Sequence, residues 1–375
     1  MKARSIKGDS PEGINSALQQ TMVEGFKPTL AIVFLTNVAD IDAVTSILAK
    51  QGITLFGAST SEKFNEEGID PDGIIVMLLD MNPAHFKIVL QDFESPAAGY
   101  AGAGKVGKAG KASFKRPAFI IITADLRIAG NDVIRGILDT AGIEVPVIGG
   151  MAGEPNQFSG FIFSNQSKSS SGLLALIIDE DKVDIKGVAV SGWKPVGTEK
   201  KITKSDGNWV YTIDDEPAMD VIKKFLGKEM VVNEKSIGID SYPLQVQRIQ
   251  GKPMMRPIVS WKEEDQSIML GAPVDDGAMF RFSLPPDFEV VDTVIESATL
   301  MKATELPEAD AMIIFSCVGR LSQLGPMLSI ELDGLAATWN TPVAGFFSLG
   351  EYGKLDDTRP EFHGTTVSWV AIKEK

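Results

Sequence analysis

The sequence predicts an α/β fold of repeated βαβ units in mixed sheets, with antiparallel segments between the units. Three stretches share one order: an apolar strand ending in a small polar residue, a helical stretch, and a second apolar strand ending in a glycine turn with a glutamate. The apolar strands do not alternate with polar residues, which indicates burial on both faces, as in a parallel sheet covered by helices. At 375 residues the chain exceeds the usual single-domain size, so two parts are expected.

The three units follow one another along the chain, and apolar residues at helical spacing join the two strands of each. Their strand segments are 31–36 with 53–62, 119–123 with 145–154, and 312–317 with 342–351. The second segments close on Glu62, Glu154 and Glu351. Ligands of such sheets gather outside the carboxyl ends of the strands, so we expect the polar and glycine residues of all three units there.

A region with strand signals typical of antiparallel sheets separates the second unit from the third. Strand signals occur at 172–178, 186–193, 200–204, 208–213, 258–261 and 267–273. The Asp206-Gly207 dipeptide predicts a hairpin turn, and Pro217 opens a helix that ends at Gly227. The change in strand pattern along the chain predicts a boundary between two parts near residues 213–220.

Composition excludes several classes of function. A net charge of −14 repels polyphosphate backbones, and the one basic run, 105–116, contains a single aromatic residue, so no nucleic-acid partner is expected. The sequence lacks a spanning apolar run and a signal peptide, which predicts a cytoplasmic protein without a membrane partner. One cysteine and two histidines allow no disulfide and no zinc site, so no metal is expected.

A glycine-rich stretch, 102–109, matches G-x-G-x-x-G and nearly matches a phosphate-binding loop. No apolar strand precedes it, and Ala109 stands where a magnesium-binding hydroxyl is required. We therefore expect an Ala/Gly/Lys-rich helix or a loop here, without a phosphate site.

The candidate ligand-binding residues come from the ends of the repeated strands. Arg320 follows a strand and a glycine, from which it could bind a carboxylate or pair with an acidic residue. Cys317 could line a pocket, pack in the core or act as a nucleophile. Glutamates of the repeats could accept from an ammonium group or cap a turn. The full predicted set is Arg320, Glu351, Cys317, His363, Ser348, Gly149, Gly150, Glu154 and Glu62.

These residues carry a family resemblance. The runs 314–320, 345–353 and 363–366 resemble the C-terminal half of FIST proteins, and 56–62, 148–154, 193–197 and 217–220 resemble the N-terminal half. The resemblance spans roughly residues 27–370 and implies a FIST N domain at 27–215 and a FIST C domain at 216–370. Gly364 departs from the family pattern, which usually has asparagine there.

The resemblance implies a non-catalytic sensory module that binds a small ligand such as an amino acid. No kinase, cyclase or F-box segment is expected outside the match, so the output is expected through a partner such as a histidine kinase or cyclase, or through a homodimer. No cofactor is predicted, but some relatives bind haem and sense nitric oxide, which leaves a haem alternative with His363 or His85 as axial ligand. A hydrolase or transferase using Cys317 or a repeat serine is a second alternative, although G-x-S-x-G is absent.

Overall fold

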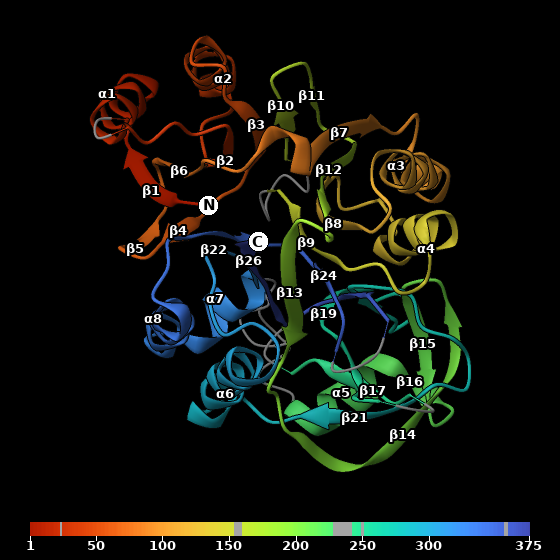
Figure 1. Cartoon of the computed structure of the whole chain (residues 1–375). Coiled ribbons are helices and arrows are strands. Elements are labelled where there is room, and N and C mark those ends of the chain that lie inside the picture. The colour runs from red at the N-terminus through yellow and green to blue at the C-terminus, as the bar shows by residue number, and fades with distance from the viewer. Residues whose placement is uncertain (23–24, 154–159, 228–241, 249–250, 356–358) are drawn as a thin grey trace.

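The computed structural model describes residues 1–22, 25–153, 160–227, 242–248, 251–355 and 359–375. Three six-stranded sheets meet at the centre of the molecule, and their helices lie on the outside (Figure 1). A fourth, eight-stranded sheet lies beside them. The predicted α/β class, with mixed sheets and antiparallel segments, is confirmed.

Each predicted βαβ unit forms a parallel strand pair at the middle of one sheet. The pairs are β2 (Leu30–Leu35) with β3 (Thr54–Ser59), β8 (Pro117–Ala124) with β9 (Val147–Ala152), and β22 (Ala311–Cys317) with β23 (Val343–Ser348). The connecting helices are α2 (Ile41–Lys50), α4 (Gly130–Ala141), and α7 (Val318–Leu324) followed by α8 (Met327–Trp339). The three strand–helix–strand predictions are therefore correct.

The repeat is longer than the βαβ unit, because each copy begins with a further strand and helix and ends with a hairpin and a last strand. The first copy adds β1 (Ala3–Gly8), α1 (Pro11–Thr21), β4 (Lys63–Asn65), β5 (Gly68–Asp70) and β6 (Ile74–Leu79). The second adds β7 (Phe86–Asp92), α3 (Gly99–Ser113), β10 (Ile162–Ser164), β11 (Lys168–Ser169) and β12 (Gly172–Asp179). The third adds β13 (Val183–Val190), α6 (Phe288–Thr304), β24 (Glu351–Gly353), β25 (Glu361–His363) and β26 (Val367–Glu374).

The hairpins are exchanged cyclically among the three repeats. The first repeat's hairpin, β4–β5, extends the sheet of the third repeat through β23. The second repeat's hairpin, β10–β11, joins the first sheet through β3, and the third repeat's hairpin, β24–β25, joins the second sheet through β9. Every sheet therefore contains strands from two repeats.

The strands are apolar throughout because both faces of each sheet are buried. In β2, Ile32 and Phe34 face the common core between the three sheets, whereas Ala31 and Val33 face the outer layer with α1 and α2. The second and third sheets follow the same rule, with α3 and α4 over one outer face and α6 to α8 over the other. This arrangement explains why the sequence showed no alternation of polar residues.

The eight-stranded sheet is inserted into the third repeat, between β13 and α6. It contains β14 (Pro195–Asp206), β15 (Trp209–Ile213), β16 (Glu216–Pro217), β17 (Leu244–Val246), β18 (Met254–Arg256), β19 (Ile258–Trp261), β20 (Ile268–Leu270) and β21 (Met279–Ser283). It has its own apolar core with helix α5 (Ala218–Leu226). The hairpin at Asp206-Gly207 forms as predicted, and the strand signals at 258–261 and 267–273 correspond to the paired strands β19 and β20.

The predicted 215/216 boundary falls inside this inserted sheet, between β15 and β16, which pair with each other. The strands predicted at 172–178 and 186–193 are not part of a separate antiparallel region. They are β12, the last strand of the second repeat, and β13, the first strand of the third repeat.

The glycine-rich stretch 102–109 lies within α3, which agrees with the helical prediction. Glycines allow this helix to pack directly against α4. A Cβ at Gly107 would lie 2.1 Å from Thr140 Oγ1, and one at Gly136 of α4 would lie 2.3 Å from the Tyr100 carbonyl oxygen. Close helix packing thus explains the motif without a phosphate.

Candidate functional site

Backbone hydrogen bonds close the carboxyl ends of the parallel strands, where the sequence predicted a ligand. Phe347 N donates to the Glu62 carbonyl oxygen at 3.0 Å, and Met151 N donates to that of Gly350 at 2.8 Å. These bonds attach each exchanged hairpin to the neighbouring repeat's second parallel strand. The hairpins thus occupy the sheet edges at the carboxyl ends.

A buried polar cluster lies at the carboxyl end of the third pair and contains several predicted residues. Ser348 Oγ lies 2.6 Å from Glu351 Oε1, and the hydroxyl of Thr366 donates to Glu351 Oε2 at 2.8 Å. Thr365 N donates to Cys317 Sγ at 3.2 Å, and Cys317 N donates to the Thr366 carbonyl oxygen at 2.9 Å. We call these five residues the Glu351 cluster.

Glu351 is held as a neutral acid at moderate pH. Burial raises the pKa of its carboxyl from 4.5 to about 8, against hydrogen bonds from Ser348 and Thr366 that lower it. The geometry agrees, because the single Ser348 proton faces both Glu351 and the Ser316 carbonyl oxygen, 3.2 Å away. Ser348 Oγ makes both hydrogen bonds when a protonated Glu351 donates to it and its own proton goes to the Ser316 carbonyl oxygen.

Cys317 is held in an inert state. Burial raises the pKa of its thiol, and the nearby Glu351 raises it further. A nucleophilic cysteine needs a lowered thiol pKa and an adjacent base. The environment thus favours the packing and lining roles over the catalytic one.

Arg320 does not face the Glu351 cluster with a free guanidinium. It is fully buried and forms a bidentate ion pair with Glu331 of α8, with Nε to Oε1 at 3.0 Å. Its Nη1 donates to the Ser191 carbonyl oxygen at 2.7 Å. The ion-pair alternative therefore holds, with a helical glutamate as the partner in place of a glutamate of the repeats.

The two predicted glycines place the second sheet against this cluster. A Cβ at Gly150 would lie 2.9 Å from the Phe315 ring and 3.1 Å from Ser348 Cβ, and one at Gly149 would lie 1.9 Å from the Ile121 carbonyl oxygen. Both positions exclude any side chain. The glycines are thus needed for packing beside Ser348.

Glu62 is not the structural counterpart of Glu351. The Glu62 backbone accepts from Phe347 N. Lys63, and not Glu62, pairs with Phe346 in the way that Glu351 pairs with Gly150. Lys63 is fully buried, and burial lowers the pKa of its ammonium to about 8. Glu154 lies outside the described residues.

Each histidine has one ring nitrogen engaged by another protein group. His363 pairs with Glu351 across β24 and β25, but its Nε2 donates to the Gly353 carbonyl oxygen at 3.0 Å. Its pKa is lowered to about 3, by burial first and Arg256 second. His85 Nδ1 contacts Glu374 at 2.7 Å. Neither histidine is among the residues that line the cavity described next.

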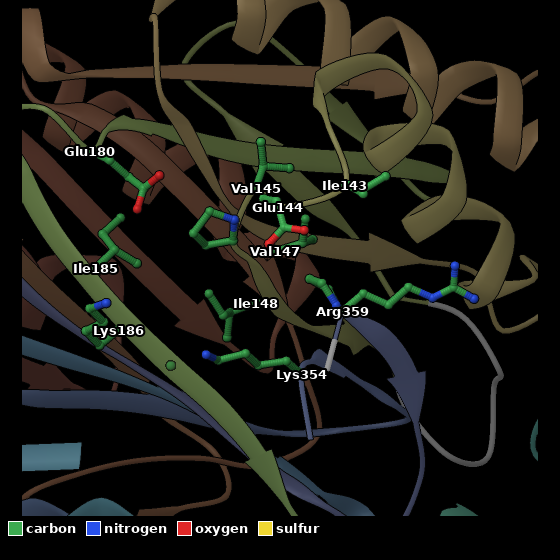
Figure 2. A pocket seen from close by; sticks show the side chains of 13 residues that line it. Ile143, Glu144, Val145, Val147, Ile148, Glu180, Ile185, Lys186, Lys354 and Arg359 are labelled. Atoms are coloured by element: carbon green, nitrogen blue, oxygen red, sulfur yellow. The ribbon is translucent and has the colours of Figure 1, made fainter. Parts of the chain in front are cut away.

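A cavity of about 350 Å³ opens near the amino end of β9, at the end of this strand opposite the Glu351 cluster (Figure 2). Its apolar wall contains Val147 and Ile148 of β9 and Ile185 of β13, all of which are nearly fully buried. Ile143, 66% exposed, also lines it. The volume suits a small metabolite.

Charges of both signs surround this cavity. Figure 2 shows the ammonium groups of Lys186 and Lys354 on one side and the guanidinium of Arg359 on the other. Lys186 lies 3.5 Å from Glu305, whereas Lys354 has no acidic side chain within 4 Å in the described part of the chain. Glu144 and Glu180 supply carboxylates, and burial raises the pKa of Glu180.

Sequence reasoning missed this cavity. Lys186 and Lys354 lie in different segments, and neither belongs to a motif. β9 and β24 are adjacent strands of one sheet, and Lys354 follows β24 directly. One signal was available: Lys354 comes three residues after Glu351, about 10 Å along an extended chain.

The described residues lack two further features. No group of three or more His, Cys, Asp or Glu side chains could hold a metal ion there. No helix in the part of the chain that the structure describes is long and apolar enough to cross a membrane.

By fold the molecule belongs to the class of mixed α/β proteins, and it has a cavity of the size of a small metabolite. The chain is a member of the FIST family: residues 29–216 match the FIST N domain and residues 218–354 match the FIST C domain. FIST domains are sensory, ligand-binding domains, and the family is generally non-catalytic.

One curated relative is a protein of Methanocaldococcus jannaschii named uncharacterized protein MJ1623. It is 24% identical over 233 residues, which cover 53% of this chain. The match covers 44% of the relative, so it spans less than half of that protein's length.

Proposed function

We propose that this protein is a non-catalytic sensor that binds an amino acid or a similar small ligand in the cavity beside Lys354. The observation that carries the proposal is the lining itself, with an apolar wall, cations and carboxylates around about 350 Å³. A zwitterion with an apolar side chain complements all three features. Its carboxylate would contact Lys354 and Lys186, its ammonium group Glu180, and its side chain the wall at Ile148.

We assign the Glu351 cluster a supporting role in this proposal. Strands β9 and β24 connect the Glu351 cluster to the cavity. The cluster would therefore fix the position of Lys354 from the end of these strands opposite the cavity. The bound state would be reported to a separate signalling protein such as a histidine kinase or cyclase. Ligand closure on β13 and β24 would change the surface near Arg359, where such a partner would bind.

The test is thermal unfolding of the purified protein against single amino acids, small organic acids, nucleotides and haemin. A ligand at 100 times its dissociation constant adds roughly 2.7 kcal/mol of stability, which shifts the unfolding midpoint by several degrees. We expect a shift with one group of amino acids and none with nucleotides. A shift with haemin alone would contradict the proposal.

Substitution of the cavity lysine localises the site. Lys354→Met keeps the apolar stem and removes the charge, so we expect about a tenfold or greater loss of ligand affinity. Lys50→Met, at an exposed position at the end of α2, is the matched control and should bind normally. Equal affinity in both variants would show that the ligand binds elsewhere.

A further inference from the structure

Arg256 of β18 carries a buried positive charge that lacks an acidic partner in the part of the chain that the structure describes. The residue is 1% exposed and lies where the inserted sheet meets β25. Its Nη1 donates to the carbonyl oxygens of Met255 and Phe362 at 3.1 and 3.4 Å, and Nη2 lies 3.5 Å from Met254 Sδ. Its Nε has no acceptor, and no acidic side chain is within 4 Å among the described residues.

Two other arginines of the described residues, Arg320 and Arg248, pair with glutamates. Arg320 is equally buried and holds both carboxylate oxygens of Glu331. Arg248 forms an ion pair with Glu361. With those charges balanced, the guanidinium of Arg256 leaves one positive charge in the seam between the inserted sheet and β25.

An unpaired buried charge costs several kcal/mol, so proteins pair it or neutralise it. Burial lowers the pKa of Arg256 only to about 10, so the group remains charged at neutral pH. A water molecule could accept from Nε but could not balance the charge. A bound anion would do both.

His363 supplies a second unsatisfied atom in the same seam. Its Nε2 proton is used by the Gly353 carbonyl oxygen, and its buried Nδ1 has no partner among the described residues. Within those residues, the charged groups that act on it are Arg256 and Arg248, both cationic, and Glu361 of the same strand is paired to Arg248. The field around this imidazole is therefore positive, as expected beside an anion site.

We propose that a small monovalent anion binds Arg256 Nε–H and holds the inserted sheet against β25 of the third repeat. The anion must be small because the seam is tightly packed. A Cβ at Gly364, next to His363, would lie 2.8 Å from Pro257 Cδ, next to Arg256. A halide or a one- or two-carbon carboxylate is small and carries the single negative charge that the site requires. This site is distinct from the cavity beside Lys354.

The test compares anions at constant ionic strength. The protein is unfolded thermally in the sodium salt of a bulky morpholine sulfonate, which is then replaced stepwise by chloride, formate or acetate. We expect the unfolding midpoint of the wild type to rise by several degrees with chloride or with the carboxylates. The more effective salt identifies the source of the anion.

Two variants make the result specific. Arg256→Met should unfold at the same temperature in every salt, and in sulfonate alone it should be more stable than the wild type. Arg281→Met, which removes a guanidinium from β21 of the same sheet, should respond to small anions as the wild type does. A wild type that is indifferent to the salt, or an Arg256→Met variant that responds normally, would overturn the proposal.

A direct measurement covers the case in which Arg256→Met does not fold. Chloride-35 magnetic resonance of the wild-type protein should show line broadening that formate or acetate reverses. Absence of broadening by chloride, together with no shift in the carboxylates, would also overturn the proposal. Lys354→Met should keep the full anion response, which separates this site from the proposed sensory cavity.

Discussion

At the residue scale, the sequence predicted a polar group at the end of the third repeat but not its chemical state. Ser348, Glu351 and Cys317 do come together, because Cys317 and Ser348 end the paired strands β22 and β23, and Glu351 begins β24 three residues after Ser348. Arg320 was expected to bind a ligand carboxylate or to pair with an acidic residue, and its partner is Glu331, eleven residues later along the chain. A pairing between two helices that turn sharply at Gly325 has no periodic signature in the sequence.

The buried carboxyl of Glu351 gives a pH prediction. Its pKa is raised in the folded state, so its contribution to stability is fully present below about pH 4.5. The contribution is lost as pH rises through about 8, because the unfolded chain ionises first. Glu351→Gln replaces the titrating carboxyl group with a neutral amide. The stability of this variant relative to the wild type should therefore increase as pH rises from 5 to 8, by roughly 1.4 kcal/mol per unit of pKa shift.

Urea unfolding at pH 5, 6.5 and 8 measures this difference. Glu296→Gln, at an exposed position on α6, should follow the wild type at each pH. A gap between Glu351→Gln and the wild type that stays constant with pH would mean that Glu351 is ionised throughout.

At the element scale, the strands and helices of the repeats were predictable because burial on two faces produces unbroken apolar runs. The hairpin exchange was not predictable. Strands β4, β10 and β24 each span three residues, and a pairing between repeats depends on register that short strands do not encode. The cavity depends on this exchange, since Lys354 reaches β13 only after β24 has joined the second sheet.

The contact between α3 and α4 gives a prediction about glycine. Gly136→Ala should destabilise the protein by about 1–3 kcal/mol, because its Cβ would lie 2.3 Å from a backbone oxygen that cannot move away. Gly104→Ala is the matched control in the same interface. Its Cβ would meet Thr140 Cγ2 at an ordinary 3.5 Å, and alanine is the better helix former by about 1 kcal/mol.

Chemical unfolding of the two variants measures the contrast. Gly104→Ala is expected to equal or exceed the wild type in stability, and Gly136→Ala to fall below it. Similar losses in both variants would indicate that α3 and α4 require small residues along the whole contact, beyond the points of closest approach.

At the scale of the whole molecule, the cyclic exchange joins the three repeats into one cooperative structure. Each sheet has an edge supplied by another repeat, so no repeat can bury its strands alone. The common core adds to this coupling, with the Phe346 ring 4.9 Å from Phe34 of the first repeat and 5.4 Å from Phe315 of the third. The inserted sheet has a separate core and stands outside the exchange.

Phe64→Ala tests this coupling. Phe64 belongs to the first repeat, but its ring packs on Phe347 of the third, with ring centres 5.1 Å apart. Truncation of a buried phenylalanine typically costs about 3–5 kcal/mol. If the repeats unfold as one unit, native-state hydrogen exchange should report an equal loss of protection in β2, β8 and β22, although β8 lies in a repeat that Phe64 does not contact. A loss confined to the sheets of the first and third repeats would mean that the repeats open separately. The exchanged hairpins would then stabilise only the sheets that they join.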